Sequence, residues 1–326
     1  MKRVIFCILV LFLLTGCASQ KKTTRDFFAM DTVMSLTVYG KNADAAISAA
    51  QTEISAMEKT LSVTKADSAV ARLNAAGTAE LPEDAIALLK RTLELSEKTG
   101  GALSPTLYRL TSLWGFTTGD YRVPTAEELE AALTEYRDGS VSLSNITVSL
   151  DGRSLDFGAV AKGEASDRVC ERLKENGVSS AILSLGGNVQ TVGLKPDGER
   201  WSIAIRDPRN EADYVGILSV GETAVVTSGG YQRFFEENGK RYIHILDPET
   251  GYPVENGLAS VTVVASSGFF ADGLSTALYV MGKQQAVEFW RSAGDFEAVF
   301  VVEDGSVFVT KGLADSFDCP DFQVIE

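Results

Sequence analysis

Short runs rich in β-branched residues dominate the chain from Ile146 onward, and their arrangement restricts the fold more than any other feature of the sequence. Such runs, bounded by turn residues, predict β-strands. In chain order they are ITVSL, SSAILSL, WSIAIRD, GILSV, TAVVTS, RYIHIL, ASVTVVA and FEAVFVVE. Helical patterns interrupt them only at 163–175, 270–281 and 284–291, without strict alternation. We therefore predict an α+β fold with mixed or mostly antiparallel sheets and packed helices, not a doubly wound parallel sheet.

Turn and cap signals locate the other elements. Asn238-Gly239 and Asp304-Gly305 lie between strand-like runs and predict hairpins. Residues 30–40 alternate like a strand, and residues 42–61 have the apolar spacing of a helix. A helical region at about 82–137 contains the Thr-x-x-Glu signature of a capping box.

The N-terminus carries the pattern of an exported lipoprotein. Lys2 and Arg3 precede an apolar run that is shorter than the ~20 residues of a membrane-spanning helix. The run ends in LTGC, which resembles a bacterial lipobox and implies lipid attachment to Cys17. We expect a signal peptide at 1–16, a polar tether at 17–26, and one catalytic unit at 27–326. The mature protein would be lipid-anchored on the outer face of the cell membrane or on its periplasmic side.

Charge and cysteine content narrow the possible partners. Loss of Lys2 and Arg3 with the signal peptide changes the formal net charge from −14 to −16. An acidic chain of this kind is a poor nucleic-acid binder, and an anionic ligand would need a cation as intermediary. Cys170 and Cys319 lie outside any metal-binding spacing, and the sequence leaves open whether they form a disulfide.

One predicted helix has two polar residues on an apolar face. Asp272 and Thr276 are four residues apart, so both side chains project from the same side. A carboxylate and a neutral oxygen together suit Mg²⁺. Alternatively, Asp272 caps the helix and Thr276 bonds back to it. The spacing alone leaves both interpretations open.

Two glycine-bearing segments are candidate ligand contacts. In LDFGAVAKGEASDRV, residues 155–169, Lys162 lies where a strand leads into a helix, an arrangement that suits a phosphate. The segment lacks P-loop spacing, so a solvated lysine in a turn is the alternative. LGGNVQTVG, residues 185–193, does not match G-x-G-x-x-G. We predict a tight turn there, packed against a ligand or another strand.

The chain contains a single histidine, His244, just before the turn signal at Asp247-Pro248. An isolated histidine in a strand can be a packed core residue. If the chemistry needs an imidazole base, however, this residue must supply it. We expect it to titrate near its ordinary pKa of about 6.5, with Asp247 as a candidate to orient it.

Together these segments resemble the ApbE family, the FAD:protein FMN transferases. The matching blocks lie in order between residues 27 and 311: FFAMDTVMSLTVYG, LSVTKADSAVARLNA, GALSPT, LDFGAVAKGEASDRV, SAILSLGGNVQTVG, TSGGYQRFF with HILDPETGYPV, and ADGLSTALYVMG. The resemblance implies a T-fold-like architecture and Mg²⁺-dependent transfer of FMN from FAD to a Thr or Ser hydroxyl. The acceptor would be an exported flavoprotein subunit of a redox complex, and AMP would be released. An FAD pyrophosphatase and a flavin-binding lipoprotein without chemistry are the alternatives.

The resemblance also implies roles for individual residues. The matching metal ligands are Asp272, Thr276 and the main-chain oxygen of Ala159, with Ser275 as a further candidate. The matching cofactor-binding positions are Met30, Ala102, Leu103, Ser104, Asp156, Lys162 and Leu246. His244 matches the family histidine near the chemistry. Thr64 stands where an aromatic residue is common, so a ring that could stack on flavin or adenine is absent from that position.

Overall fold

The computed structural model describes residues 21–326, apart from the side chain of Glu211. The predicted signal peptide, Cys17 and the first residues of the predicted tether lie outside the described residues. Among residues 21–326, no helix is both long and apolar enough to cross a membrane. Cys170 and Cys319 are both free thiols in this structure.

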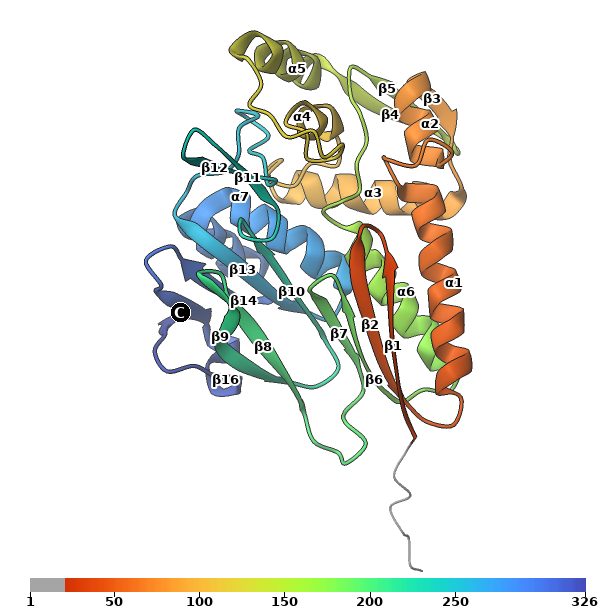
Figure 1. The fold of residues 1–326 in the computed structure, drawn as a ribbon, viewed down its shortest axis with the longest axis vertical. Helices are drawn as coiled ribbons and strands as arrows, with labels where there is room; N and C mark the ends of the chain where they lie inside the picture. The colour runs from red at the N-terminus through yellow and green to blue at the C-terminus, as the bar shows by residue number, and fades with distance from the viewer. Residues whose placement is uncertain (1–20) are drawn as a thin grey trace, which may run out of the picture.

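A nine-stranded sheet forms the centre of the fold (Figure 1). In spatial order its strands are β1 (Lys22–Ala29), β2 (Thr32–Tyr39), β6 (Ser180–Leu185), β7 (Asn188–Val192), β10 (Ala224–Gly229), β13 (Leu258–Ala265), β14 (Glu297–Val302), β15 (Val307–Thr310) and β17 (Gln323–Ile325). Neighbouring strands are antiparallel except β15 and β17, which are parallel. The predicted α+β class with mostly antiparallel sheet is confirmed.

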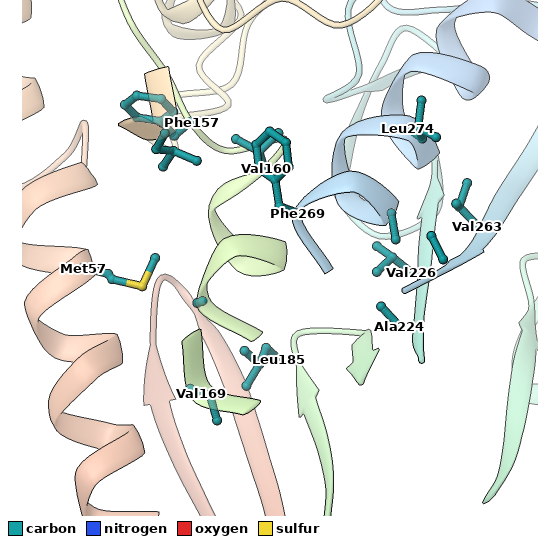
Figure 2. Close-up of a cluster of buried hydrophobic side chains, with 14 of the residues drawn as sticks. Met57, Phe157, Val160, Val169, Leu185, Ala224, Val226, Val263, Phe269 and Leu274 are labelled. Atoms are coloured by element: carbon teal, nitrogen blue, oxygen red, sulfur yellow. The ribbon is translucent and has the colours of Figure 1, made fainter. Parts of the chain in front are cut away.

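Helices cover one face of this sheet. They are α1 (Ala43–Leu61), α6 (Ala161–Glu175) and α7 (Gly268–Ala293). Helix α6 packs between α1 and α7, and α7 lies against β10 and β13. Figure 2 shows part of the resulting cluster, with Val160 and Phe269 where α6 and α7 begin and Val226 and Val263 on β10 and β13. The break predicted between two helices near 282 is a kink in α7 at Gly282 (φ 74°).

A small sheet covers part of the opposite face. It consists of β8 (Trp201–Asp207), β9 (Asn210–Val220) and β16 (Phe317–Asp318), joined to β15 through the 3₁₀ helix Lys311–Ser316. Because side chains alternate along a strand, Val225 and Val299 point into this second core while Val226 and Ala298 point toward the helices. The central sheet is therefore buried on both faces over β10 and β14.

The remaining elements surround the ends of β1, β2 and α7. They are α2 (Ala69–Ala76), α3 (Glu83–Lys98), α4 (Tyr108–Leu113), α5 (Ala126–Asp138), the sheet of β3 (Thr78–Glu80), β5 (Thr147–Asp151) and β4 (Ser140–Ser144), and the hairpin of β11 (Phe234–Glu237) and β12 (Lys240–Ile243). The predicted capping box is present at Thr125 and Glu128, at the start of α5. The hairpins predicted at Asn238-Gly239 and Asp304-Gly305 are also present.

The predicted tether is wrong at its C-terminal end, because Lys22–Asp26 belong to β1. This edge strand lacks a clear apolar pattern in the sequence, because only alternate residues are half-buried and polar residues occupy most of it. The strand predicted at 30–40 begins instead with a two-residue turn. Met30 and Asp31 both have positive φ, 48° and 60°, and connect β1 to β2.

Candidate active site

The first two turns of α7 lie beside the start of α6, and this junction contains the predicted metal ligands. Ser267 is the N-cap of α7, and its side chain accepts a hydrogen bond from Phe270 N. Asp272 lies one turn further on, so the interpretation of Asp272 as the cap of this helix is wrong. Its carboxylate instead points toward α6.

Asp272 is a buried carboxylate with few partners. Its side chain is almost fully buried, with the residue 3% exposed, and Oδ2 accepts a hydrogen bond of 2.8 Å from Gly163 N. Lys162 Nζ lies 3.7 Å from Oδ1. Burial raises the pKa of Asp272, while the Lys162 ammonium opposes that shift. A buried carboxylate that meets one N–H and one distant ammonium is suited to receive a cation.

The close approach of α6 and α7 depends on Gly163. A Cβ at this position would lie 2.1 Å from Gly268 O and 2.7 Å from the Cβ of Asp272. Since the Gly163 N–H points to Asp272, no described hydrogen bond joins it to the carbonyl of Ala159, four residues earlier. The half-buried Ala159 therefore keeps a main-chain oxygen that can bind a ligand.

Three hydroxyl groups stand next to Asp272. Ser275 donates to Asp272 O at 2.9 Å, so in its 2.8 Å contact with Ser228 the Ser228 hydroxyl is the donor. Thr276 then donates, either to Ser228 Oγ at 3.3 Å or to Asp272 O at 3.4 Å. Both choices leave lone pairs of Thr276 Oγ1 free. Ser275 is fully buried and already both donates and accepts, which favours Thr276 as the ligand.

Asp156 and Lys162 flank the segment that leads into α6. Asp156 Oδ1 accepts from Gly158 N at 2.8 Å, and Lys162 Nζ lies 3.5 Å from Gly158 O. Burial raises the pKa of Asp156, and the charges of Lys162 and Arg233 oppose this rise. The segment thus presents a lysine at a helix N-terminus, as predicted, and the same lysine forms an ion pair with Asp272.

His244 follows β12 directly and is held by the backbone of Arg233. Its N–H and its ring Nδ1 both meet Arg233 O at 3.1 Å. A carbonyl can only accept, so Nδ1 carries the proton and Nε2 has the free lone pair. Burial, with help from the Arg233 and Lys162 charges, lowers the pKa of His244 to about 4. The expected value near 6.5 is therefore wrong.

Asp247 does not orient this ring in the structure, contrary to expectation. Its Oδ1 accepts from Glu249 N at 2.8 Å and so stabilises the turn that ends at Gly251. The ring of Phe116 instead contacts His244 edge to face, at 6.4 Å between centroids. The imidazole is thus fixed by a main-chain carbonyl and an aromatic ring.

The sequence prediction missed three residues of this site: Ser228, Arg233 and Asn188. Arg233 Nη2 donates to Asp31 Oδ2 at 2.6 Å and so ties the β1–β2 turn to His244. Ser228 and Arg233 lie in the block TSGGYQRFF, in which the glycines indicate a turn and no spacing of polar residues indicates a site. Asn188 lies in LGGN and is almost fully buried.

The other predicted cofactor-binding residues lie on three separate segments. Met30 occupies the β1–β2 turn, where its N–H donates to Glu58. Leu103 is buried beside α7, and Leu246 is buried just after His244. Ser104 bonds to the hydroxyl of Tyr136 at 3.0 Å, and Ala102 is half-buried next to Leu103. Within residues 21–326, no hydrogen bond or ion pair joins Met30, Ser104 or Leu246 directly to Asp272.

The loop around Thr64 contains no aromatic residue, but Tyr108 of α4 contacts it. The Tyr108 hydroxyl donates to Val63 O at 3.3 Å. Thr64 itself contacts the Ser62 hydroxyl at 3.2 Å. An aromatic side chain is therefore present beside the position at which the family resemblance led us to expect one.

Within residues 21–326, no three side chains of His, Cys, Asp or Glu gather closely enough to hold a metal. A cation at this junction would thus depend on hydroxyl and main-chain oxygens as well as on Asp272. Such a donor set of hard oxygens is typical of Mg²⁺.

Comparison with known proteins gives consistent matches over most of the chain. The sequence model of the ApbE family matches residues 30–300. An FAD:protein FMN transferase of Treponema pallidum is 34% identical and covers 92% of this chain and 90% of its own. One from Klebsiella pneumoniae is also 34% identical, with 78% and 81% covered.

Solved structures agree with this result. The ApbE protein of Thermotoga maritima superposes with a TM-score of 0.85 at 32% identity, over 91% of this chain and 99% of its own. The apo form of the Pseudomonas stutzeri flavinyl transferase ApbE gives a TM-score of 0.81 at 32% identity, over 92% and 98%.

Proposed function

Because this chain belongs to the ApbE family, it is an FAD:protein FMN transferase, and we propose how its own residues carry out the reaction. FMN would pass from FAD to a Thr or Ser hydroxyl of an acceptor protein, with a phosphoester formed and AMP released. The observation that carries the proposal is the buried Asp272 carboxylate, with the Thr276 hydroxyl on the same helix face and Lys162 beside it.

The residues at this junction fit a divalent cation. Asp272 lacks enough hydrogen bonds to satisfy a buried charge, Thr276 has free lone pairs, and Ala159 has a main-chain oxygen not taken by helix bonding. These three would hold Mg²⁺, which would supply charge neutralisation on the diphosphate of FAD. We therefore propose that the activity depends on Mg²⁺.

Lys162 and Arg233 add positive charge where the substrate is most negative. Both cations act electrostatically on His244 and on Asp156, so they lie near one another although the chain is acidic overall. They would orient the diphosphate and offset its repulsion by a chain with a net charge of −14.

His244 would accept the proton of the attacking hydroxyl. The acceptor oxygen attacks the phosphorus of the FMN half, its proton passes to Nε2, and the bond from that phosphorus to the bridging oxygen breaks. AMP leaves with the bridging oxygen. Since the ring is neutral down to a pH of about 4, it is available as a base at neutral pH.

The acceptor and the location rest on sequence patterns alone. The lipobox-like LTGC supports lipidation of Cys17 and attachment to the outer face of the membrane. We propose an exported acceptor of the redox-subunit type, because an anchored transferase meets substrates in the same compartment.

Mass spectrometry of a co-expressed exported flavoprotein subunit tests the proposal. The full chain should add the mass of FMN to the subunit, and Asp272→Ala and His244→Ala should abolish the addition. Asp304→Ala, in the exposed β14–β15 turn, serves as a matched control and should keep it. Equal AMP formation with and without acceptor would instead identify a pyrophosphatase. Unchanged FAD would identify a binding protein.

A further inference from the structure

Asn188 is placed beside the candidate cation site by the turn that precedes it. Gly186 and Gly187, both with positive φ, form a two-residue turn between β6 and β7, and Asn188 is the first residue of β7. A Cβ on Gly186 would lie 2.6 Å from the Thr32 hydroxyl, so the turn is packed tightly against β2. Asn188 is 2% exposed, and its position is therefore well fixed.

Gln190, two residues further along β7, shows which way this face points. Gln190 Nε2 donates to Asp167 Oδ1 at 2.8 Å, and its carbonyl oxygen accepts from the Ser166 hydroxyl, both on α6. Alternate residues of a strand share a face, so Asn188 points toward α6 as well. Two residues of a strand span about 6.6 Å, close to the rise of one helical turn. Gln190 contacts Ser166, so Asn188 lies level with Gly163, about one turn earlier in α6.

The Asn188 side chain has an incomplete interaction at that level. Burial raises the pKa of the Asp272 carboxylate, and the nearby Asn188 amide opposes that rise. Yet Asn188 Nδ2 makes no hydrogen bond of normal length and angle with any residue in the described part of the chain. The contact with Asp272 is thus too long or too bent. A buried amide left in this state is costly and rare, which points to a partner arrangement that forms on ligand binding.

We propose that Asn188 is a positioning residue for the cation site, whose amide N–H completes a hydrogen bond to Asp272 when that carboxylate binds the ion. The inference rests on the Mg²⁺ dependence proposed above. With Gly163 N holding one oxygen, a second donor from Asn188 would fix the plane of the carboxylate. Groups that orient a metal ligand in this way typically change metal affinity by about 10- to 100-fold when removed.

The test is the Mg²⁺ concentration that gives the half-maximal thermal shift of the full chain, measured with Mg²⁺ alone and with FAD present. Asn188→Leu keeps the side-chain size but removes the donor, and it should raise this concentration about tenfold or more. Gln190→Leu is the matched control on the same strand face. It loses bonds to α6, so it should lower the melting temperature while leaving the Mg²⁺ midpoint within about twofold of the wild type.

Asn188→Asp decides the question if the leucine variant fails to fold. A second carboxylate beside Asp272 should destabilise the metal-free chain and enlarge the thermal shift that Mg²⁺ produces. A wild-type midpoint in Asn188→Leu, equal increases in Asn188→Leu and Gln190→Leu, or an unchanged shift in Asn188→Asp would each overturn the proposal. If the wild type itself shows no Mg²⁺ shift with FAD present, the proposed metal dependence fails instead, a distinguishable result.

Discussion

Lowering the pH should destabilise this protein through His244, and the size of the effect follows from the site. The folded chain lowers the pKa of the imidazole from 6.5 to about 4. The unfolded chain therefore binds the proton first, and stability must fall as the pH drops from 6.5 toward 4. The full contribution of the neutral imidazole to the free energy of unfolding is present above pH 6.5. Between pH 7 and pH 4.5 the loss comes to about 2 kcal/mol, an upper value because the side chain is only half-buried.

Urea denaturation at pH 7 and pH 4.5 isolates this contribution when wild type and His244→Asn are compared. Carboxylates titrate in both proteins, so the difference between the two pH-dependent losses belongs to the imidazole. Since the chain has one histidine, the imidazole Hε1 signal in the proton NMR spectrum of untagged protein is unique and gives the pKa directly. A titration midpoint near 6.5, or a double difference below about 0.5 kcal/mol, would falsify the argument that burial and Arg233 keep the ring neutral.

Three other substitutions test the site and its supports. Asp272→Ala should abolish the Mg²⁺-induced thermal shift and lower AMP release from FAD at least about 100-fold, since it removes the charged ligand; a retained shift would place the cation elsewhere. Gly163→Ala should lower the free energy of unfolding by about 3 kcal/mol, because its Cβ would meet Gly268 O at 2.1 Å; urea curves matching the wild type would show that α6 and α7 separate easily. Thr125→Ala should cost about 1 kcal/mol through loss of the α5 cap without altering turnover; lowered turnover would connect α5 to the reaction.

Local sequence signals correctly predicted those features of the fold that only a few residue types can form. The Thr125 capping box, the Asn238-Gly239 hairpin and the break at Gly282 all appear where expected, because cap, turn and left-handed positions accept few alternatives. Asp272 and Thr276 were predicted to share a helix face, and they do so.

The rest depended on tertiary contacts that local patterns cannot report. β1 is an edge strand with little apolar content, so its pairing with β2 was invisible in the sequence. The low pKa of His244 arises from burial and from Arg233, eleven residues away along the chain. Asn188 becomes a candidate only when β7 is seen beside α6. Its unpaired amide is a property of that packing and not of the motif around it.

If Cys17 is lipidated as proposed, the early start of β1 would limit where the enzyme can work. Lys21 already accepts a backbone hydrogen bond from Gly40, so only residues 18–20 separate the proposed lipidated Cys17 from the folded body. Even fully stretched, those four steps reach about 14 Å. The eight residues of β1 then extend about 26 Å to the Met30–Asp31 turn. Under the proposed lipidation, FMN would reach only hydroxyls held within about 40 Å of the bilayer surface. The length of this linker would thus select acceptors by the distance of their hydroxyl group from the bilayer, as well as by their sequence.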